Sequence, residues 1–307
     1  MRQPLQFLAL MLAAGTMIAG YRVEELIAAG GMGTVYRATQ LSLGRVVALK
    51  LLSDELGREP AFRARFRREA VLQAALEHPH IVPVYEAGES PHGLYIAMRF
   101  LEGANLEQHI ARAARRTVLS LLTGIANALD AAHAEGLVHR DLKPQNILVA
   151  RDHAYLADFG LTAAAGLSSM TSAGHFLGTA DYVSPEQIRD EELDARSDVY
   201  SLGAVVYRCM TGSVPFPRAT RVAVIYAQLE QLPEPASSVA RELPASLDPV
   251  LARALAKNPA ERQASAGELI QAAHAALAGG ASAALDRPPS PPTPDAARPA
   301  TTTTRSR

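Results

Sequence analysis

The chain has 307 residues, of which 48% are hydrophobic, enough for two modest domains or one two-lobed domain with a sizeable core. Its 30 Lys and Arg nearly balance its 31 Asp and Glu, and a net charge of -1 argues against a protein that binds nucleic acid in bulk. The single cysteine, Cys209, excludes an internal disulfide and fits a reducing compartment. It lies in an apolar helical pattern, which predicts a packed core thiol.

The first twenty residues allow three interpretations. Arg2 precedes an apolar run at 5–14, as in a secretory signal, but the run is too short to span a bilayer and no clear cleavage site follows. The segment is an extension or an early start, a helix packed on the domain, or a membrane-targeting segment. We expect residues 1–19 to be an extension outside the core.

Residues 21–103 carry the pattern of short strands and one helix. Phe62, Phe66, Ala70 and Ala74 recur at helical spacing within 59–77. The strand-like runs, which glycines separate, are 21–27, 33–39, 46–51, 81–87 and 94–100.

From residue 104 onward the pattern is mostly helical, so a strand-rich lobe precedes a helix-rich one. A cleft between two such lobes is a favoured ligand site. Residues 279–307 concentrate prolines and then threonines, which predicts a disordered tail. The helical runs are 118–135, 198–210, 223–231, 247–256 and 266–277.

A charged stretch at 138–146 runs directly into a strand-like apolar pattern. A carboxylate there could orient an incoming hydroxyl and accept its proton. A lysine could neutralise a moving phosphoryl group, and an asparagine oxygen could bind a hard divalent cation. The stretch resembles the catalytic loop of protein kinases, in which His-Arg-Asp is followed by a spacer and Asn. The matching residues are His139, Arg140, Asp141, Lys143 and Asn146.

Two further motifs follow the order that this family requires. The run 157–160 is Ala-Asp-Phe-Gly, and by the resemblance Asp158 holds the metal that bridges the nucleotide phosphates. The run 47–50 is Val-Ala-Leu-Lys, and Lys50 would be costly to bury without a partner. We expect Glu69, in the helix of this lobe, to form the ion pair with Lys50.

A glycine-rich hairpin and a hinge-like segment at 96–103 resemble the walls of the family's nucleotide site. Gly30, Gly33 and Val35 match the pattern Gly-x-Gly-x-x-Gly-x-Val, but Ala28 replaces its first glycine. Its methyl group is expected to stiffen the loop or weaken nucleotide affinity without abolishing binding. The resemblance implies ATP contacts, with a gatekeeper at 98, for Ile27, Ala28, Ala29, Gly30, Gly31, Met32, Gly33, Val35, Ala48, Lys50, Met98, Leu101 and Glu102.

The stretch 178–186 resembles the segment that docks a protein substrate. The resemblance implies that Thr179 bonds the catalytic aspartate and lysine, and that Glu186 pairs with Arg262. It also implies that Asp198 fixes the backbone of the catalytic loop. This segment, with Lys143, is of the serine/threonine type.

The finer resemblance is to bacterial Hanks-type serine/threonine kinases, carried by 30–36, 77–89 and 185–187. It implies an α+β, two-lobed protein kinase fold over 20–278, with an N-lobe of about 20–101 and a C-lobe of about 102–278. The implied ligands are ATP and Mg²⁺, with Mn²⁺ as the alternative cation, and the implied partners are protein substrates rather than nucleic acid. The family also allows a homodimer through the N-lobe, and we expect a cytoplasmic location.

The catalytic set implied by the resemblance is Asp141, Lys143, Lys50, Glu69, Asn146 and Asp158, with Asn146 and Asp158 as metal ligands. Autophosphorylation is expected in the loop before 178, unless its hydroxyls are simply polar surface. Arginines at 63, 65, 67 and 68 could help to bind such a phosphate or form a solvated helix face. In order of preference the candidate phosphosites are Thr171, Ser172, Ser169 and Ser168.

Two other classes of function stay open from the sequence. A pseudokinase would keep the fold without turnover, and Ala28 alone favours it because the catalytic set is complete. A small-molecule phosphotransferase of related fold would not need the substrate-docking stretch 178–186.

Overall fold

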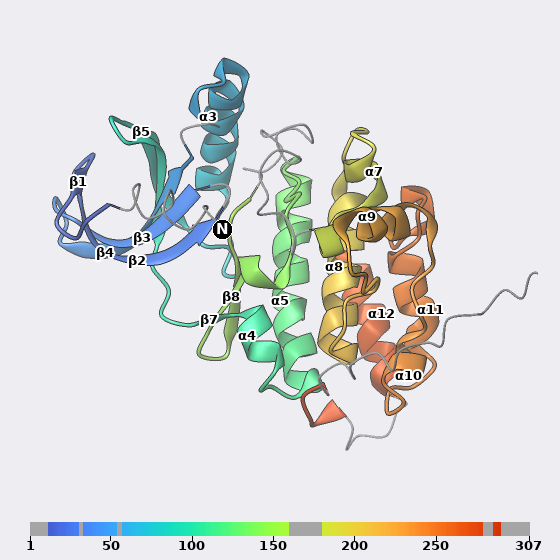
Figure 1. The fold of residues 1–307 in the computed structure, drawn as a ribbon. Coiled ribbons are helices and arrows are strands. Elements are labelled where there is room, and N and C mark those ends of the chain that lie inside the picture. Colours follow the sequence, from blue (N-terminus) through green and yellow to red (C-terminus); the bar gives the residue numbers. More distant parts are fainter. Residues whose placement is uncertain (1–11, 31–32, 54–56, 160–179, 279–284, 290–307) are drawn as a thin grey trace, which may run out of the picture.

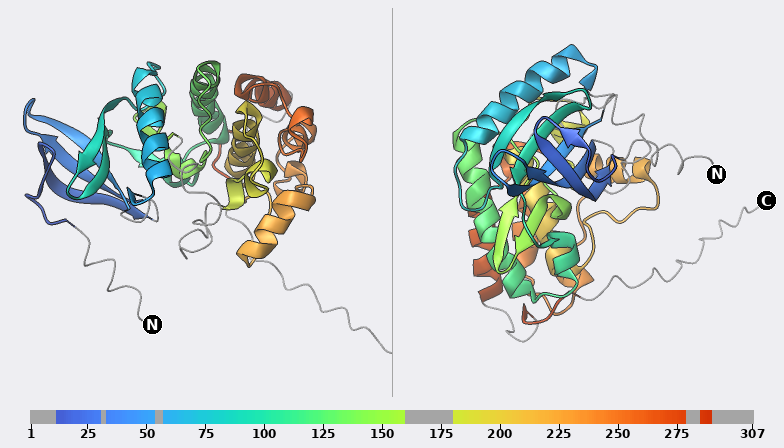
Figure 2. Two further views of the ribbon diagram at one scale, coloured as in Figure 1. Left: turned by 90° about the horizontal axis from the view of Figure 1, so that it is seen from above. Right: turned by 90° about the vertical axis from the view of Figure 1, so that its left-hand side faces the viewer.

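The structure is a computed structural model that describes residues 12–30, 33–53, 57–159, 180–278 and 285–289. This part of the chain forms two lobes, a sheet with one long helix and a larger helical lobe (Figure 1). Seen from above, the two lobes lie side by side, with α3 (Pro60–Ala75) and α5 (Arg115–Ala134) between the sheet and the remaining helices (Figure 2). This arrangement is the two-lobed protein kinase fold that the sequence predicted.

The N-lobe sheet has six antiparallel strands in the order β1-β2-β3-β4-β6-β5. In β4 the residues Val47, Leu49 and Leu51 alternate toward a buried cluster, as expected of a strand with one apolar face. Lys50 points to the other face, opposite Val35 of β3 and Ile96 of β6. The strands are β1 (Met17–Ile18), β2 (Tyr21–Gly30), β3 (Gly33–Gln40), β4 (Arg45–Leu52), β5 (Val84–Ser90) and β6 (Gly93–Arg99).

Helix α3 (Pro60–Ala75) covers one face of this sheet. A proline opens it, where the missing N–H costs nothing, and the chain becomes extended at Leu76. Phe62, Phe66 and Ala70 are buried at four-residue spacing, which confirms the predicted helix. The two phenylalanines pack with Met98 of β6, and this contact places the α3 face carrying Glu69 toward the second lobe.

The C-lobe is built around α8, in which almost every residue is buried. Cys209 of α8 is fully buried, as predicted. A small antiparallel sheet of β7, β8 and β9 lies on the side that faces the N-lobe. The elements are β7 (Ala104–Asn105), α4 (Leu106–Ile110), α5 (Arg115–Ala134), η1 (Pro144–Asn146), β8 (Ile147–Ala150), β9 (His153–Leu156), η3 (Ala180–Tyr182), α7 (Pro185–Ile188), α8 (Ala195–Thr211), α9 (Arg221–Glu230), α10 (Ala236–Val239), α11 (Leu247–Ala254), η4 (Pro259–Glu261) and α12 (Ala266–Ala278).

Both ends of the domain differ from the sequence prediction. Residues 1–19 were expected outside the core, yet β1 pairs with β2 and Ile18 is buried in the N-lobe cluster. Residues 279–307 were expected to be disordered, yet Leu285 is buried in the C-lobe core and Arg115 N donates to Arg287 O at 3.2 Å. In both places a buried apolar side chain is accompanied by backbone hydrogen bonds to the domain, including Gly15 N to Val23 O at the N-terminal end. Among the described residues, no helix is both long and apolar enough to cross a membrane.

Candidate active site

The catalytic-loop backbone is fixed by one buried carboxylate near the start of α8. Asp198 accepts hydrogen bonds from His139 N at 2.7 Å, Arg140 N at 2.9 Å and His133 Nε2 at 2.7 Å. Burial by itself would raise the pKa of Asp198, but the hydrogen bond from His133 holds it below the ordinary value. The role that the sequence predicted for Asp198 is therefore confirmed.

Two side chains of the same loop, Lys143 and Asn146, hydrogen-bond the Asp141 carboxylate. Lys143 Nζ donates to Asp141 Oδ2 at 2.7 Å, and Asn146 Nδ2 donates to the same oxygen at 2.9 Å and to Asp141 O at 2.8 Å. Arg140, just before it, has a positive φ of 66°, a conformation that costs a non-glycine residue about 1–3 kcal/mol. The loop backbone is thus strained so that three polar side chains meet at one point.

His139 bonds the backbone of this loop as a neutral imidazole. Burial lowers its pKa, although the nearby Asp198 carboxylate acts in the opposite direction. Asp141 N donates to His139 Nδ1 at 3.2 Å, so Nε2 carries the proton, and Nε2 lies 2.9 Å from Ala157 O. The ring also packs on Phe159, with centroids 4.7 Å apart. One histidine therefore joins the catalytic loop to the segment that carries Asp158.

Lys50 and Asp158 join the two lobes. Lys50 Nζ lies 2.8 Å from Asp158 Oδ1, and the side chains are 8% and 27% exposed. Burial by itself would raise the pKa of Asp158, but the Lys50 ammonium holds it below its ordinary value, so the pair is ionic. Asp158 has a positive φ of 62°, the second such strained residue at this site.

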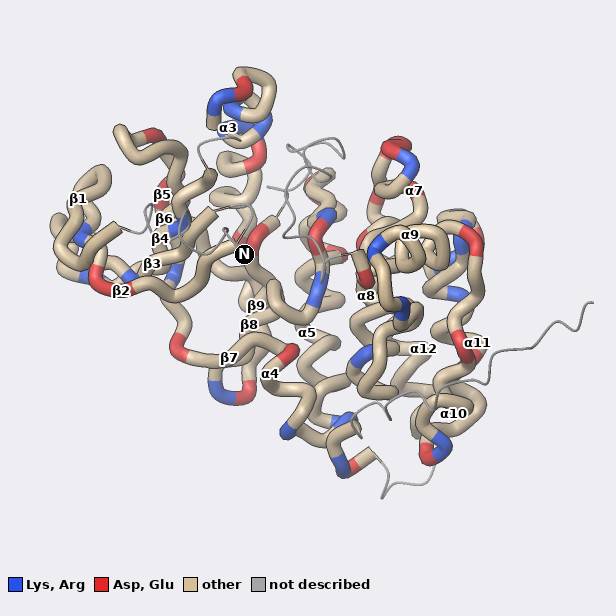
Figure 3. The backbone as a smooth tube through the Cα atoms, in the orientation of Figure 1, with Lys and Arg blue, Asp and Glu red and all other residues tan. Residues whose placement is uncertain are grey.

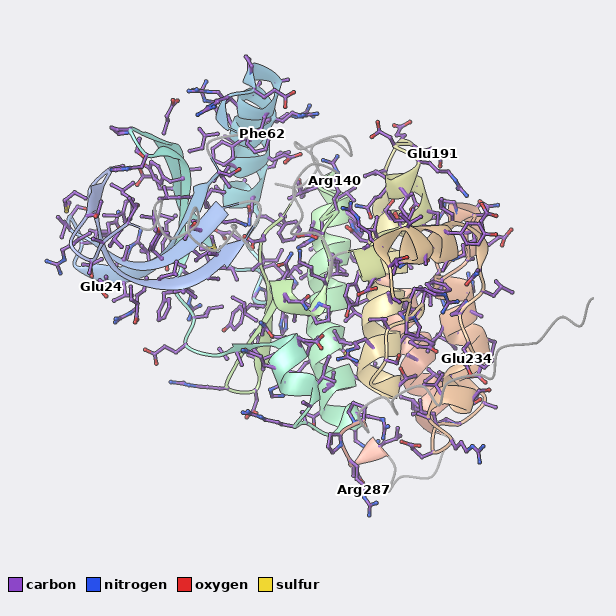
Figure 4. The ribbon with its side chains drawn as sticks, viewed as in Figure 1. Glu24, Phe62, Arg140, Glu191, Glu234 and Arg287 are labelled. Carbon is purple, nitrogen blue, oxygen red and sulfur yellow. The ribbon has the colours of Figure 1, made fainter. Side chains whose placement is uncertain are left out.

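The expected ion pair between Lys50 and Glu69 is wrong for this structure. Glu69 Oε1 accepts instead from Arg140 NH1 at 2.9 Å, while Lys50 bonds Asp158. Figure 4 shows Arg140 where α3 and the helical lobe approach each other. Burial raises the pKa of Glu69 despite the Arg140 charge, and Arg140 bonds only one of the two carboxylate oxygens, since Oε2 is buried without a hydrogen-bond partner.

Most of the residues expected to contact ATP lie on strands β2, β3, β4 and β6. Residues 27–30 lie at the exposed end of β2, Gly33 and Val35 on β3, and Ala48 beside Lys50 on β4. Met98 is buried at the end of β6, and Leu101 and Glu102 follow in the link to the C-lobe. The φ of Gly33 is +143°, and an added Cβ would lie 1.9 Å from Leu51 O, so this glycine cannot be replaced without moving the strand. Gly31 and Met32 lie outside the described residues.

A divalent cation fits the two oxygen donors that the resemblance assigns to it. Asn146 directs its amide nitrogen at Asp141, which leaves the amide oxygen for a cation, and Asp158 supplies a carboxylate. Carboxylate and amide oxygens are hard donors that Mg²⁺ and Mn²⁺ accept. The residues present therefore suit such an ion.

A buried ion pair anchors the docking segment in the C-lobe. Arg262 NH1 lies 2.6 Å from Glu186 Oε1 and Arg262 NH2 lies 2.8 Å from Oε2, so the predicted pair is present and is bidentate. Ser197 Oγ donates to Glu186 Oε1 at 2.7 Å. Burial by itself would raise the pKa of Glu186, but the Arg262 hydrogen bond and charge hold it below its ordinary value. Thr179 and the candidate phosphosites Thr171, Ser172, Ser169 and Ser168 lie outside the described residues.

The arginines of α3 lie between residues 63 and 68, toward the start of that helix (Figure 3). Arg63 and Arg67 both pair with Glu89 of β5. Within the described part of the chain, two of the four arginines considered for phosphate binding thus have an acidic partner in their own lobe.

Sequence reasoning missed two contacts that shape the loop. His133, near the end of α5, bonds Asp198, and Gln187 Nε2 donates to Arg140 O at 2.6 Å. Neither residue lies in a motif with catalytic chemistry. The capping box of Ser184 and Gln187 at the start of α7 was a readable signal for a helix start, but not for the contact with the loop.

The fold and these contacts define the class of the protein. A carboxylate gripped by a lysine and an asparagine on one loop, beside a lysine–aspartate pair that links two lobes, is the arrangement of a protein kinase. The chain belongs to that family: the protein kinase domain model matches residues 21–274.

Similar proteins place it among the bacterial Hanks-type kinases. The serine/threonine-protein kinase PknJ of Mycobacterium tuberculosis is 44% identical over 289 residues, 91% of this chain and 49% of PknJ. PknE of the same organism is 42% identical over 269 residues, 86% of this chain and 47% of PknE. A crystal structure of the M. tuberculosis PknI kinase domain matches with a TM-score of 0.74 and 33% identity, covering 87% of this chain and 100% of that one. The chain spans about half the length of the curated relatives that it matches.

Proposed function

We propose that this chain is a serine/threonine protein kinase that transfers the γ-phosphoryl group of MgATP to hydroxyl groups of proteins. The observation that carries the proposal is the Asp141 carboxylate, which Lys143 and Asn146 approach at 2.7 and 2.9 Å. A carboxylate fixed in this way can orient a hydroxyl and accept its proton. Lys143, already beside it, supplies a positive charge where negative charge moves during transfer.

The Lys50–Asp158 pair is proposed to receive the nucleotide. When bound, a divalent cation neutralises phosphate charge and fixes the phosphate oxygens in space. Asp158 would hold that cation, and Lys50 would pair with the α- and β-phosphates. Each group exchanges one opposite charge for another, so neither is left buried and unpaired. Asn146 completes the cation site with its amide oxygen.

Several finer points belong to the same proposal. Mg²⁺ is the proposed cation and Mn²⁺ the alternative, and Ile27, Ala28, Ala29, Gly30, Gly31, Met32, Gly33, Val35, Ala48, Met98, Leu101 and Glu102 are the proposed nucleotide contacts. Autophosphorylation at Thr171, then Ser172, Ser169 and Ser168, is proposed to regulate the enzyme. Mass spectrometry after incubation with MgATP tests it, and no phosphate on residues 161–178 would exclude it. A homodimer through the N-lobe and a cytoplasmic location remain predictions.

The direct test compares the wild-type protein with Asp141→Asn, using radiolabelled ATP and histone as the acceptor. We expect labelled phosphoserine or phosphothreonine on histone with the wild type, and a rate lower by at least about a hundredfold with the variant. Both proteins should bind MgATP, because Asp141 contacts the acceptor side. MgATP binding without transfer by the wild type would favour a pseudokinase, and equal labelling by both proteins would defeat the assignment of Asp141.

A further inference from the structure

Three consecutive backbone carbonyls of η3 accept hydrogen bonds from side chains of α8 and α9. Gln228 Nε2 of α9 donates to Ala180 O at 3.1 Å and to Asp181 O at 2.8 Å. Ser201 Oγ of α8 donates to Tyr182 O at 2.8 Å. A single 3₁₀ turn cannot satisfy its own carbonyls. Side chains of the lobe below therefore decide where this part of the docking segment runs.

The amide group of Gln228 is oriented from its other side. Tyr200 of α8 donates its hydroxyl proton to Gln228 Oε1, so the amide nitrogen must face the η3 carbonyls. Burial raises the pKa of Tyr200, so the hydroxyl keeps its proton at neutral pH. Lys257 Nζ lies 3.3 Å from the Tyr200 hydroxyl and donates to its oxygen. Donation thus runs in one direction, from Lys257 through Tyr200 and Gln228 to η3.

Tyr200 and Gln228 are too deeply buried for their polar groups to be explained by filling space alone. Gln228 and Tyr200 are both 0% exposed. A buried amide is costly unless its hydrogen bonds are made, and an apolar side chain would fill the same space without that cost. The amide makes three hydrogen bonds here, and two of them end on the docking segment. The buried amide of Gln228 is therefore explained by the two η3 carbonyls that it holds in place.

We propose that Gln228 is a positioning residue for the protein acceptor. It fixes the backbone of Ala180 and Asp181, and through them the docking surface that continues toward Glu186 and the catalytic loop. The inference rests on the proposed kinase function, since it assigns Gln228 to the acceptor side of that reaction. It acts through the backbone and touches neither the nucleotide nor the transferred group.

The first test is Gln228→Met, which keeps the volume and removes the hydrogen bonds. With histone as the acceptor, we expect KM for histone to rise by roughly tenfold or more, since small displacements of a docking surface cost rate steeply, while KM for ATP stays within about twofold. Hydrogen exchange should become faster in residues 180–188 than in α5 or α12. A variant that only lost global stability would not raise KM for histone while leaving KM for ATP unchanged.

A matched pair of tyrosines on α8 supplies the control. Tyr200→Phe removes the donor to Gln228, and Tyr207→Phe removes a similar buried hydroxyl that donates to Glu234 O at 2.9 Å, away from η3. We expect a higher KM for histone with Tyr200→Phe and an unchanged one with Tyr207→Phe. An unchanged histone KM in Gln228→Met, or equal effects of the two tyrosine variants, would overturn the proposal. If the wild type transfers no phosphate, the proposed function fails, and hydrogen exchange still decides whether Gln228 anchors η3.

Discussion

Breaking the buried pair of Glu186 and Arg262 is predicted to be among the most damaging single changes in the C-lobe. Their side chains are 4% and 0% exposed, and both oxygens of the carboxylate are bonded to the guanidinium. Arg262→Ala leaves Glu186 buried without its cation, which costs about 3–5 kcal/mol in such pairs. For a domain of this size about 2–4 °C is lost per kcal/mol, so the Tm should fall by about 6–20 °C.

Urea denaturation followed by circular dichroism measures this loss. The control is Arg253→Ala, whose pair with Glu268 at 2.8 Å is exposed, and it should cost less than about 1 kcal/mol. The double variant Glu186→Gln with Arg262→Met should be more stable than Arg262→Ala, because no buried charge is left unpaired. Equal losses for Arg262→Ala and Arg253→Ala would refute the reasoning that burial makes this pair strong.

Three further predictions follow from the site. Asp198→Asn should lower kcat by about ten- to a hundredfold with little change in KM for ATP, because the amide nitrogen replaces one of the two oxygens and so faces the N–H donor of either His139 or Arg140; steady-state kinetics measure it. The pKa of Glu186 is lowered in the folded protein, so the stability that its carboxylate contributes is complete above the ordinary pKa of 4.5 and is lost as the pH falls through the folded pKa. The difference in unfolding free energy between the wild type and Glu186→Gln should therefore shrink below about pH 4.5. Urea titrations from pH 7 to 3 measure this difference. Arg140→Gln should destabilise the fold by about 1–3 kcal/mol in thermal melts, and Glu69→Gln added to it should recover part of that loss, whereas no recovery would argue against the Glu69 contact.

The sequence predicted the contacts whose partners are defined by motif and chain order. Asp198 and Arg262 were assigned correctly because the family motif names the contact of each: the catalytic-loop backbone for Asp198 and Glu186 for Arg262. Both contacts are buried because α8 packs at the centre of the lobe. Glu69 was assigned to Lys50, but the structure pairs it with Arg140. Arg140 lies 71 positions away on the catalytic loop of the other lobe, and the loop conformation that brings its guanidinium to Glu69 is not written in the residue spacing.

The ends of the domain were mispredicted for a different reason. Strand β1 is two residues long, too short to show alternation, and Ile18 is recognisable as a core residue only from the sheet that it completes. Leu285 stands among prolines and small residues whose composition is typical of disorder. Gln228 was missed because a buried glutamine on a helix carries no motif, and its partners are backbone carbonyls 47 and 48 positions away.

The most direct measurement of the central claim is a double-mutant cycle on kcat/KM with Lys50→Met and Asp158→Asn, in single-turnover assays with MgATP and histone. Lys50 and Asp158 lie 2.8 Å apart and are proposed to act on one nucleotide, so each single variant should lose at least about a hundredfold. The kcat/KM of the double variant should lie no more than about tenfold below that of the less active single variant, because the effects of residues that act as a unit are not additive. Losses that multiply in full would contradict a shared nucleotide and the account built on it.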